Sequence, residues 1–271
     1  MTDHVAIETL VSSIAPGSKL AVPVDYSGVS MAATAAMVQA GIGRLHLVCV
    51  PVSGMQADIL IGAGLVETIE TSAVTLGEAG GAPRFAAAVR DGSIKLMDAT
   101  CPAIHAGLLA AQKGVPFMPI AGILGSDLLR VRPDWKVIDS PVGGEPIVVV
   151  PAIAPDVALF HAPEADHFGN VRIGRRRELA AMAYAAKRTI VTVERITDRN
   201  LLETEDSAAG VLPALYVDQV AVAAQGAWPL PLWDTYAGDD AEAARYAGMA
   251  RTMEGFRAWL DEFAGRRARA A

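Results

Sequence analysis

The sequence predicts an α/β fold with a mixed, largely parallel sheet flanked by helices. In its first half, short β-branched runs alternate with small-residue amphipathic stretches, which is the pattern of parallel strands joined by crossover helices. After Pro146, three β runs follow one another across Pro, Asp and Gly turns with little helix between them, so strands are expected to return there. The 271 residues are enough for one large core or two linked lobes.

The first half divides into strands and helices at recognisable boundaries. A helix over 29–40 should end at Gly41, because glycine is favoured directly after a helix. Pro51 should end the strand before it, because proline cannot donate to a sheet. We expect strands at 19–24, 45–50, 58–61, 73–76 and 94–97, and helices at 29–40, 65–71, 83–90 and 103–113.

The second half is expected to add further strands, one crossover helix and two closing helices. Strands are predicted at 147–150, 157–161, 171–173, 189–194 and 216–223, and helices at 177–186, 240–249 and 252–264. In the closing helices, Tyr246, Phe256, Leu260 and Phe263 are spaced so that apolar groups can dock onto the body. We therefore predict one domain over residues 1–271 with a C-terminal helical segment at about 239–265.

The composition indicates a globular chain that keeps apolar surface for a partner. Hydrophobic residues make up 52% of the chain and charged residues only 20%, so Ala, Gly and Val must cover much of the surface. The net charge of -7 argues against a general nucleic-acid binder, which needs clustered Lys and Arg. Two basic clusters are expected to be solvated faces or helix-end charges rather than anion sites: Arg172 with Arg175 to Arg177, and Arg266, Arg267 and Arg269.

Membrane segments, disulfides and metal sites are not predicted. No apolar run reaches the roughly 18 residues of a spanning helix, and the amino end is acidic where a signal peptide would be basic. We therefore expect a cytoplasmic protein. Cys49 and Cys101 lie far apart, and the five histidines include no i, i+4 pair. The acidic group at 164–167 is expected to be a surface loop.

Glycine pairs and catalytic elbows give little support to nucleotide binding or serine chemistry. Neither the pair at 41–43 nor the pair at 62–64 continues to the third glycine of a dinucleotide fingerprint. The amides at 62–65 could hold an anionic group at a helix start, although tight packing is the commoner explanation. No Gly-x-Ser-x-Gly elbow is present, so a serine hydrolase is not expected.

A rigid apolar segment over 114–127 is the strongest candidate for a ligand-holding loop. Its two prolines restrict the backbone, whereas Gly122 and Gly125 permit positive φ or the close approach of a ligand. Ser126 and Asp127 then supply a hydroxyl and a carboxylate at its end. A turn that served packing alone would not need all of these residue types.

Two further side chains are candidates for chemistry, and each has a plainer alternative. Cys101 lies at a strand-to-helix junction four residues before His105, so thiol and imidazole could approach each other. A buried small residue beside a capping-region histidine is the simpler interpretation. Glu78 is surrounded by glycines that would let a bulky ligand approach its carboxylate, although a turn carboxylate is the simpler interpretation.

The order of motifs along the chain resembles the family I coenzyme A transferase alpha subunits, and the glutaconate CoA-transferase type most. The motifs begin with DILIGAGLV at 58–66, PRF at 83–85 and the run from PFMP to GSD at 116–127. They continue with GEP at 144–146, PAIAPDVAL at 151–159 and ADHFGNV at 165–171. The resemblance covers roughly residues 15 to 235, and the ordered combination is specific although each piece alone is weak.

The resemblance implies the fold of the CoA-transferase superfamily, a beta subunit of similar fold, and exchange of CoA between two carboxylic acids. Acyl-CoA and a carboxylic acid would be the substrates, with no permanently bound cofactor. In this family a glutamate, normally of the beta subunit, carries CoA as a glutamyl thioester. We expect Gly122 and Gly125 to offer amides to an oxyanion or carboxylate, Ser126 to donate and Asp127 to orient. Cys101 is expected to contact substrate, and Glu78 is the only nucleophile that we would consider in this chain.

Two alternatives to CoA transfer stay open. Alpha chains of the ring-opening hydrolase branch carry Ser-Glu-Gly where this chain has Thr100-Cys101-Pro102, which weakens a thioester or ring-opening hydrolase without excluding it. A ligand-binding relative that kept the fold and lost the chemistry is also compatible with the altered residues. The acid substrates and the stoichiometry do not follow from one chain.

Overall fold

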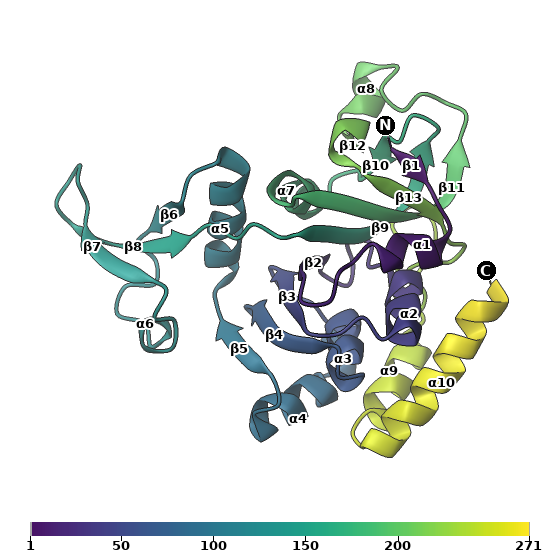
Figure 1. Ribbon diagram of the computed structural model, residues 1–271, viewed down its shortest axis with the longest axis horizontal. Helices are drawn as coiled ribbons and strands as arrows, with labels where there is room; N and C mark the ends of the chain where they lie inside the picture. Colours follow the sequence, from purple (N-terminus) through teal and green to yellow (C-terminus); the bar gives the residue numbers. More distant parts are fainter. Residues whose placement is uncertain (1, 271) are drawn as a thin grey trace.

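A largely parallel sheet forms the body of the protein, with strand order β1-β13-β11-β9-β2-β3-β4-β5 (Figure 1). The computed structural model describes residues 2–270, with side chains through residue 267. The strands are β1 (Asp3–His4), β2 (Lys19–Pro23), β3 (Leu45–Val50), β4 (Val66–Thr71), β5 (Lys95–Asp98), β9 (Val157–Asp166), β11 (Arg188–Thr197) and β13 (Gln219–Val222). The short strands β10 (Val171–Arg172) and β12 (Val211–Leu212) pair antiparallel beside the end of β9. The predicted α/β class with a mixed, largely parallel sheet is confirmed.

Helices cover both faces of the sheet and bury an apolar core on each. One face carries α1 (Ile7–Ser12), α2 (Met31–Ala40), α3 (Met55–Gly62), α4 (Pro83–Asp91), α9 (Asp240–Met249) and α10 (Met253–Ala270). The other face carries α5 (Cys101–Lys113) and α7 (Arg177–Ala185). Tyr246, Phe256 and Phe263 of the closing helices enter the first core, as their spacing predicts, and Leu260 packs half-buried against it. The short α8 (Glu205–Ala208) and the 3₁₀ turns η1 (Gly77–Ala79) and η2 (Ala214–Tyr216) lie in connections.

Capping residues set the ends of the crossover helices. The Ser30 hydroxyl accepts the N–H of Ala33 at the start of α2, and Gly41 ends the helix with a left-handed φ of 65°. Thr100 caps α5 in the same way, and Gly114 ends it with a φ of 67°. The strands predicted at 19–24, 45–50 and 94–97 and the helices predicted at 29–40, 83–90 and 103–113 are confirmed with small shifts of boundary.

Between β3 and α4 the predicted assignment is wrong. The run at 58–61 belongs to helix α3, and 65–71 is largely strand β4. Every residue from Met55 to Ile61 is buried, so this segment has no polar face from which a helical period could be read. The predicted strand at 73–76 is only a connection with isolated bridges, at Val74 to Ser53 and at Thr75 to Gly81.

The acidic group at 164–167 is not a surface loop. Glu164 and Asp166 lie in β9, whose ten residues are all buried. The Asp166 carboxylate accepts N–H groups of Phe168, Asn170 and Leu201 at 2.9 to 3.0 Å. It therefore fixes the turn after β9, a structural use of a carboxylate that composition alone does not distinguish from an exposed loop.

A small lobe, residues 114–151, projects from the body beside α5 (Figure 1). It contains β6 (Phe117–Ile120), α6 (Leu128–Val131), β7 (Lys136–Asp139) and β8 (Pro146–Pro151), and its antiparallel sheet has the order β6-β8-β7. The sequence predicted a strand at 147–150 but neither of its two partners. Arg132 ties the lobe to the body, because its guanidinium donates to Glu70 of β4 at 2.7 Å and to the Asp98 carbonyl of β5 at 3.2 Å.

Candidate active site at the carboxyl edge of the sheet

The centre of the sheet contains a point where the chain leaves two neighbouring strands in opposite directions. β2 and β9 pair in parallel, and the chain then moves from β2 to β3 on one side and from β9 to β11 on the other. Helix α2 covers one face after β2, and α7 covers the other after β9. Open α/β sheets bind ligands in the crevice outside the carboxyl ends of strands at such points.

Asp25 joins the loops that follow β2 and β3. Its carboxylate accepts the N–H groups of Gly54 at 3.0 Å and Met55 at 3.1 Å, at the first turn of α3. Burial raises the pKa of Asp25 to about 6, against the opposing effect of these two hydrogen bonds. Gly54 has no room for a side chain, because a Cβ there would lie 2.2 Å from Asp25 Oδ2 and 2.4 Å from the Thr75 carbonyl. The loops after three strands are thus locked against one another.

Glu194 organises the loop that follows β13. Its carboxylate accepts hydrogen bonds from the N–H groups of Gln225 at 2.7 Å and Gly226 at 3.0 Å. It also accepts the Tyr236 hydroxyl at 2.8 Å and faces His161 Nε2 at 2.8 Å. Because an ionised carboxylate can only accept, Nε2 of His161 carries the proton. All four donors hold the loop against the carboxyl ends of β9 and β11.

The His161 ring is fully buried and bridges two strands. Burial lowers the pKa of His161, although the neighbouring Glu194 carboxylate opposes this shift. The lowered pKa keeps the imidazole neutral. Its Nδ1 accepts from the Thr192 hydroxyl at 2.8 Å, and Thr192 lies 2.6 Å from the Ser30 hydroxyl that caps α2. The His161 amide donates to the Gly28 carbonyl at 2.6 Å, so the loop after β2 runs tightly along β9.

Two adjoining cavities open at this edge. One, of about 460 Å³, is lined by Val24, Pro51, His105 and Arg175 among others, and the second, of about 420 Å³, by Pro231, Trp233 and Tyr236 among others. Both also touch Tyr26 and Arg176. The basic cluster at 172–177 is therefore not simply a solvated face. Arg172 pairs with Asp234 at 2.7 Å, and Arg175 and Arg176 line a cavity.

Cys101 lies at the same edge, where β5 passes into α5. Its Sγ lies 3.1 Å from the Ser72 hydroxyl, and that hydroxyl donates to the Pro51 carbonyl at 2.8 Å. The expectation that Cys101 is a buried small residue is wrong, because the side chain is exposed. It begins α5 directly after the Thr100 cap, so its position at the helix start directs it outward.

The comparison with known families decides the family of the chain. The model of the coenzyme A transferase family matches residues 4–223, which include nearly all of the central sheet and the lobe. The chain belongs to the coenzyme A transferase family. The loop that Glu194 holds beyond residue 224 and the closing helices lie outside the matched residues.

This coenzyme A transferase is similar to known relatives both in sequence and in structure. A 3-oxoadipate CoA-transferase chain of Pseudomonas knackmussii, one of the subunits of that enzyme, is 33% identical over 239 residues, which cover 86% of this chain and 82% of that protein. The crystal structure of glutaconate coenzyme A-transferase from Acidaminococcus fermentans superposes with a TM-score of 0.86 and 27% identity, over 96% of this chain and 88% of that one. A decarboxylase, AibA/AibB, superposes with a TM-score of 0.83 and 27% identity, over 98% and 97% of the two chains.

Glu78 of this coenzyme A transferase lies in the η1 turn, which packs beside α9. Its side chain is exposed, and it forms no hydrogen bond or ion pair with any side chain through residue 267. Glu78 is therefore a carboxylate in an exposed turn, and its role as a nucleophile stays a prediction.

The four residues predicted in the segment 114–127 lie in the lobe. The Ser126 hydroxyl accepts the Leu128 N–H at 3.2 Å, and Asp127 pairs with Arg130 at 2.7 Å at the surface. Gly125 has a φ of 75°, which explains the glycine, whereas no atom would stand within 4 Å of a Cβ on Gly122. No hydrogen bond or ion pair in the described part of the chain joins these residues to Glu78 or Cys101. Their role in substrate binding stays a prediction.

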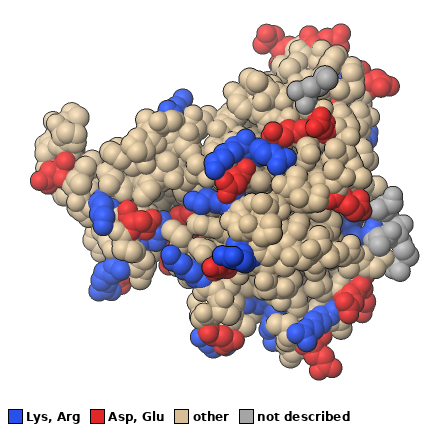
Figure 2. All heavy atoms as spheres, in the orientation of Figure 1, with Lys and Arg blue, Asp and Glu red and all other residues tan. Residues whose placement is uncertain are grey.

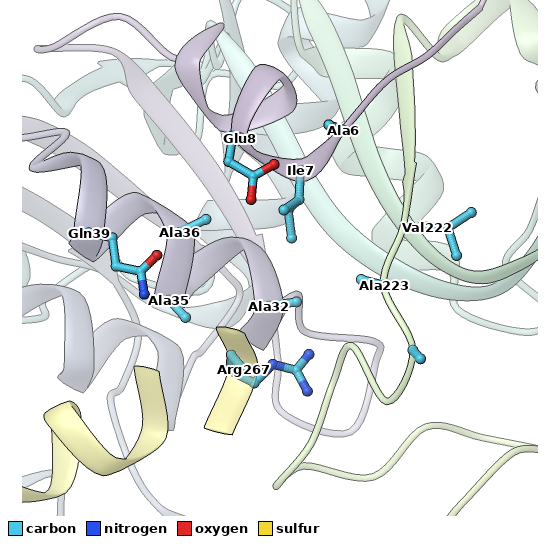
Figure 3. A pocket seen from close by; sticks show the side chains of 11 residues that line it. Ala6, Ile7, Glu8, Ala32, Ala35, Ala36, Gln39, Val222, Ala223 and Arg267 are labelled. Carbon is cyan, nitrogen blue, oxygen red and sulfur yellow. The ribbon is translucent and has the colours of Figure 1, made fainter. Parts of the chain in front are cut away.

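A further cavity of the transferase, of about 540 Å³, lies away from the predicted residues, between α1, α2 and the end of β13 (Figure 3). Its walls include Ala32, Ala35 and Ala36, and Arg267 reaches its edge (Figure 3). Arg267 is half-buried and donates to the Gln225 carbonyl at 2.7 Å, so it is not a solvated helix-end charge. The side chain of Arg269, predicted to be one, lies outside the described residues.

Residues 2–270 give no sign of a metal site or of a membrane span. Among the described residues no group of three His, Cys, Asp or Glu side chains is placed to hold a metal ion. No helix in that part of the chain combines the length and apolarity that crossing a bilayer requires.

Proposed function

We propose that this chain is the alpha subunit of a heteromeric CoA-transferase that moves CoA between carboxylic acids. The family match over residues 4–223, together with the 33% identity to a 3-oxoadipate CoA-transferase chain, carries the proposal. Coenzyme A is then a substrate, and we infer no permanently bound cofactor. We place the enzyme in the cytoplasm, where acyl-CoA thioesters are made and used.

The proposed reaction splits one exchange into covalent steps at a glutamate. The glutamate carboxylate attacks the thioester carbonyl and expels CoA thiolate, which leaves a mixed anhydride. The thiolate then attacks the glutamyl carbonyl, releases the donor acid as its carboxylate and forms a glutamyl-CoA thioester. The acceptor carboxylate repeats these steps in reverse, so atoms and charge balance without an oxidant or a metal.

We propose that the nucleophilic glutamate belongs to the beta subunit. The carboxylates of Asp25 and Glu194 at the carboxyl edge accept backbone N–H groups that fix the loops, and Glu78 is exposed without a positioning partner in the described residues. Treatment of the complex with acyl-CoA, followed by borohydride or hydroxylamine, should label the beta subunit only. Label on Glu78 of this chain would refute the assignment.

The role that we propose for this chain is to form one wall of the cleft. Loops after β2 to β5, including Cys101, would face the partner's glutamate, and Gly122, Gly125, Ser126 and Asp127 would contact the acid or its thioester. The N–H groups of Gly122 and Gly125 have no backbone acceptor among the described residues, which leaves them free to meet an oxyanion. Ser126→Ala should then raise KM for the acid and leave the free energy of unfolding nearly unchanged.

We infer that the lobe supplies the surface on which the beta subunit docks. Seven large apolar side chains there are exposed: Val115, Phe117, Leu124, Val131, Val137, Ile138 and Val142. In the view of Figure 2, most of the surface is formed by residues other than Lys, Arg, Asp and Glu, with charged side chains of both signs scattered over it. Val142, 97% exposed, is the sharpest probe, because Val142→Asp should weaken the complex without unfolding the chain.

The activity is tested by CoA exchange catalysed by the complex of this chain with its partner. Transfer of label from an acyl-CoA to a second acid, without net release of free CoA, supports the proposal. Release of free CoA without an acceptor would identify a hydrolase, and release of CO2 a decarboxylase, the activity of the solved relative AibA/AibB. Absence of all three would leave the non-catalytic ligand-binding relative.

A further inference from the structure

We propose that Arg175 and Arg176 form a carboxylate-binding site that favours acids with a second, distal carboxylate. The proposal rests on the CoA-transferase activity proposed above and adds the class of acid. It arises from the cavity of about 460 Å³ at the crevice between β2 and β9, which both arginines line.

The two arginines lack the carboxylate partners that neighbouring cations have. Arg172 pairs with Asp234 at 2.7 Å, and Arg195 pairs with Glu164 at 2.8 Å. Within residues 2–267 neither Arg175 nor Arg176 forms an ion pair, although they are adjacent in the chain and line the same cavity. Two like charges beside a cavity repel each other, and an anion held between them relieves that repulsion.

Arg176 is held in position before any ligand arrives. Its guanidinium stacks on the Trp233 ring, 4.1 Å from the ring centre. Burial lowers the pKa of Arg176 even though Asp234 and Glu178 lie near enough to oppose the shift. A partly desolvated cation whose plane is fixed by stacking loses little entropy when it binds a carboxylate through two parallel N–H groups.

The side chain of Glu178 also lines this cavity, and its hydrogen-bond partner is Ser27 rather than an arginine. The Ser27 hydroxyl donates to Glu178 in a very short hydrogen bond, and Ser27 itself is fully buried. Glu178 therefore forms its hydrogen bond on the side of β2 and no ion pair with either arginine within the described residues, although its charge acts on Arg176. His105 of α5 lines the cavity as well and adds a further donor.

The remaining wall favours a carboxylic acid over the phosphates of CoA. Val24 and Pro51 give the cavity an apolar side, against which a short aliphatic chain can lie with its far end at the arginines. Its volume of about 460 Å³ is within the usual range for small-molecule sites. Phosphates would gain nothing from the apolar wall, whereas a dicarboxylic acid can place its chain against Val24 and Pro51 and its distal carboxylate at the arginines.

The test compares two acceptors of equal chain length, glutarate and pentanoate, with the complex carrying Arg175→Gln or Arg176→Gln. We expect KM for glutarate to rise about 10-fold or more in each variant, since charged hydrogen bonds of this kind are lost. KM for pentanoate and kcat for both acids should change by less than about 2-fold. Arg177→Gln, at an exposed arginine next in the chain, is the matched control and should leave both KM values unchanged.

Three results would overturn the proposal or separate it from the proposed function. Equal losses for both acids that vanish with a 3′-dephospho-CoA thioester would assign the arginines to a CoA phosphate instead. Unchanged KM for glutarate in both variants would remove the site altogether. If the wild-type complex transfers no CoA, titration calorimetry of glutarate with the full chain still decides: binding lost in Arg175→Gln supports the site while the proposed function fails. Arg175→Gln is used for this measurement because Arg175 is exposed, so its replacement should not disturb the fold.

Discussion

Replacing Arg132 is a perturbation for which the structure predicts a large loss of stability. Its guanidinium lies 2.7 Å from Glu70 and 2.8 Å from Asp134, and it stacks over the Trp135 ring at 4.4 Å. The side chains of Arg132 and Glu70 are each only 3% exposed. The pair is also the polar contact that joins the lobe to β4, so Arg132→Met acts on both the core and the docking of the lobe.

The magnitude follows from the charge that would be left behind. Removing one partner of a buried pair leaves the other without compensation and costs about 3–5 kcal/mol. For a chain of this size that corresponds to a fall in Tm of roughly 6–20 °C. Arg130→Met is the matched control, because its pair with Asp127 is 77% and 86% exposed and should contribute about 0–1 kcal/mol.

Thermal and urea unfolding followed by circular dichroism measure the difference. Glu70→Leu combined with Arg132→Met should recover most of the loss, since no buried charge then remains. If Arg132→Met is no less stable than Arg130→Met, the pair does not anchor the lobe and the reasoning fails.

The pH dependence of the same variant gives an independent check. Burial alone would raise the pKa of Glu70, but His46, 3.6 Å away, and Arg132 outweigh it and hold that pKa below its usual value. A lowered pKa means that the stabilisation is present above the unfolded value, about 4.3, and is lost as pH falls through the folded value. The gap in Tm between Arg132→Met and the wild type should therefore narrow below about pH 4.

Three further predictions concern the carboxyl edge. Gly54→Ala should destabilise the chain by about 1–3 kcal/mol in urea unfolding, because its Cβ would meet Asp25 and a carbonyl, whereas Gly122→Ala should be near neutral; equal effects would contradict the tight packing. The raised pKa of Asp25, about 6, should contribute a loss of stability as pH rises from about 4 to 6, so the Tm of the wild type relative to that of Asp25→Asn should fall over this range in a pH series, and a constant difference would contradict the raised pKa. Glu194→Gln should cost about 2–3 kcal/mol and increase hydrogen exchange at 225–236, and unchanged exchange there would disprove its role in holding the loop.

The elements that the sequence predicts well are those with a local boundary signal. Ser30 and Gly41 bracket α2, and Thr100 and Gly114 bracket α5, so two crossover helices could be placed before any tertiary contact was known. The segment 55–62 carries no such signal, because it is buried on every side and its one acid, Asp58, accepts the Tyr246 hydroxyl from a helix far along the chain. Propensity cannot anticipate a partner that distant.

The site could be predicted only in part for a related reason. The segment 114–127 has a distinctive composition, which singles it out but does not reveal that it lies in a projecting lobe. The cavity at the edge is made by Tyr26, His105 and Arg176, which follow or belong to three different elements. The sequence predicts Arg176 only as part of a solvated basic cluster and His105 only as a neighbour of Cys101, so the switch between β2 and β9 is what brings them together with Tyr26.

The hydrogen bonds that the carboxylates at the carboxyl edge accept bear on which residue can act as the nucleophile. A nucleophilic carboxylate has to present a free lone pair to a carbonyl carbon from a fixed position. Asp25 and Glu194 have a fixed position because they accept backbone N–H groups, and each of their carboxylate oxygens already accepts at least one hydrogen bond. Glu78 has free oxygen atoms, but within the described residues nothing holds it. This arrangement supports our proposal that another chain brings a carboxylate that is both free and fixed to this edge, with the exposed apolar side chains of the lobe as its docking surface.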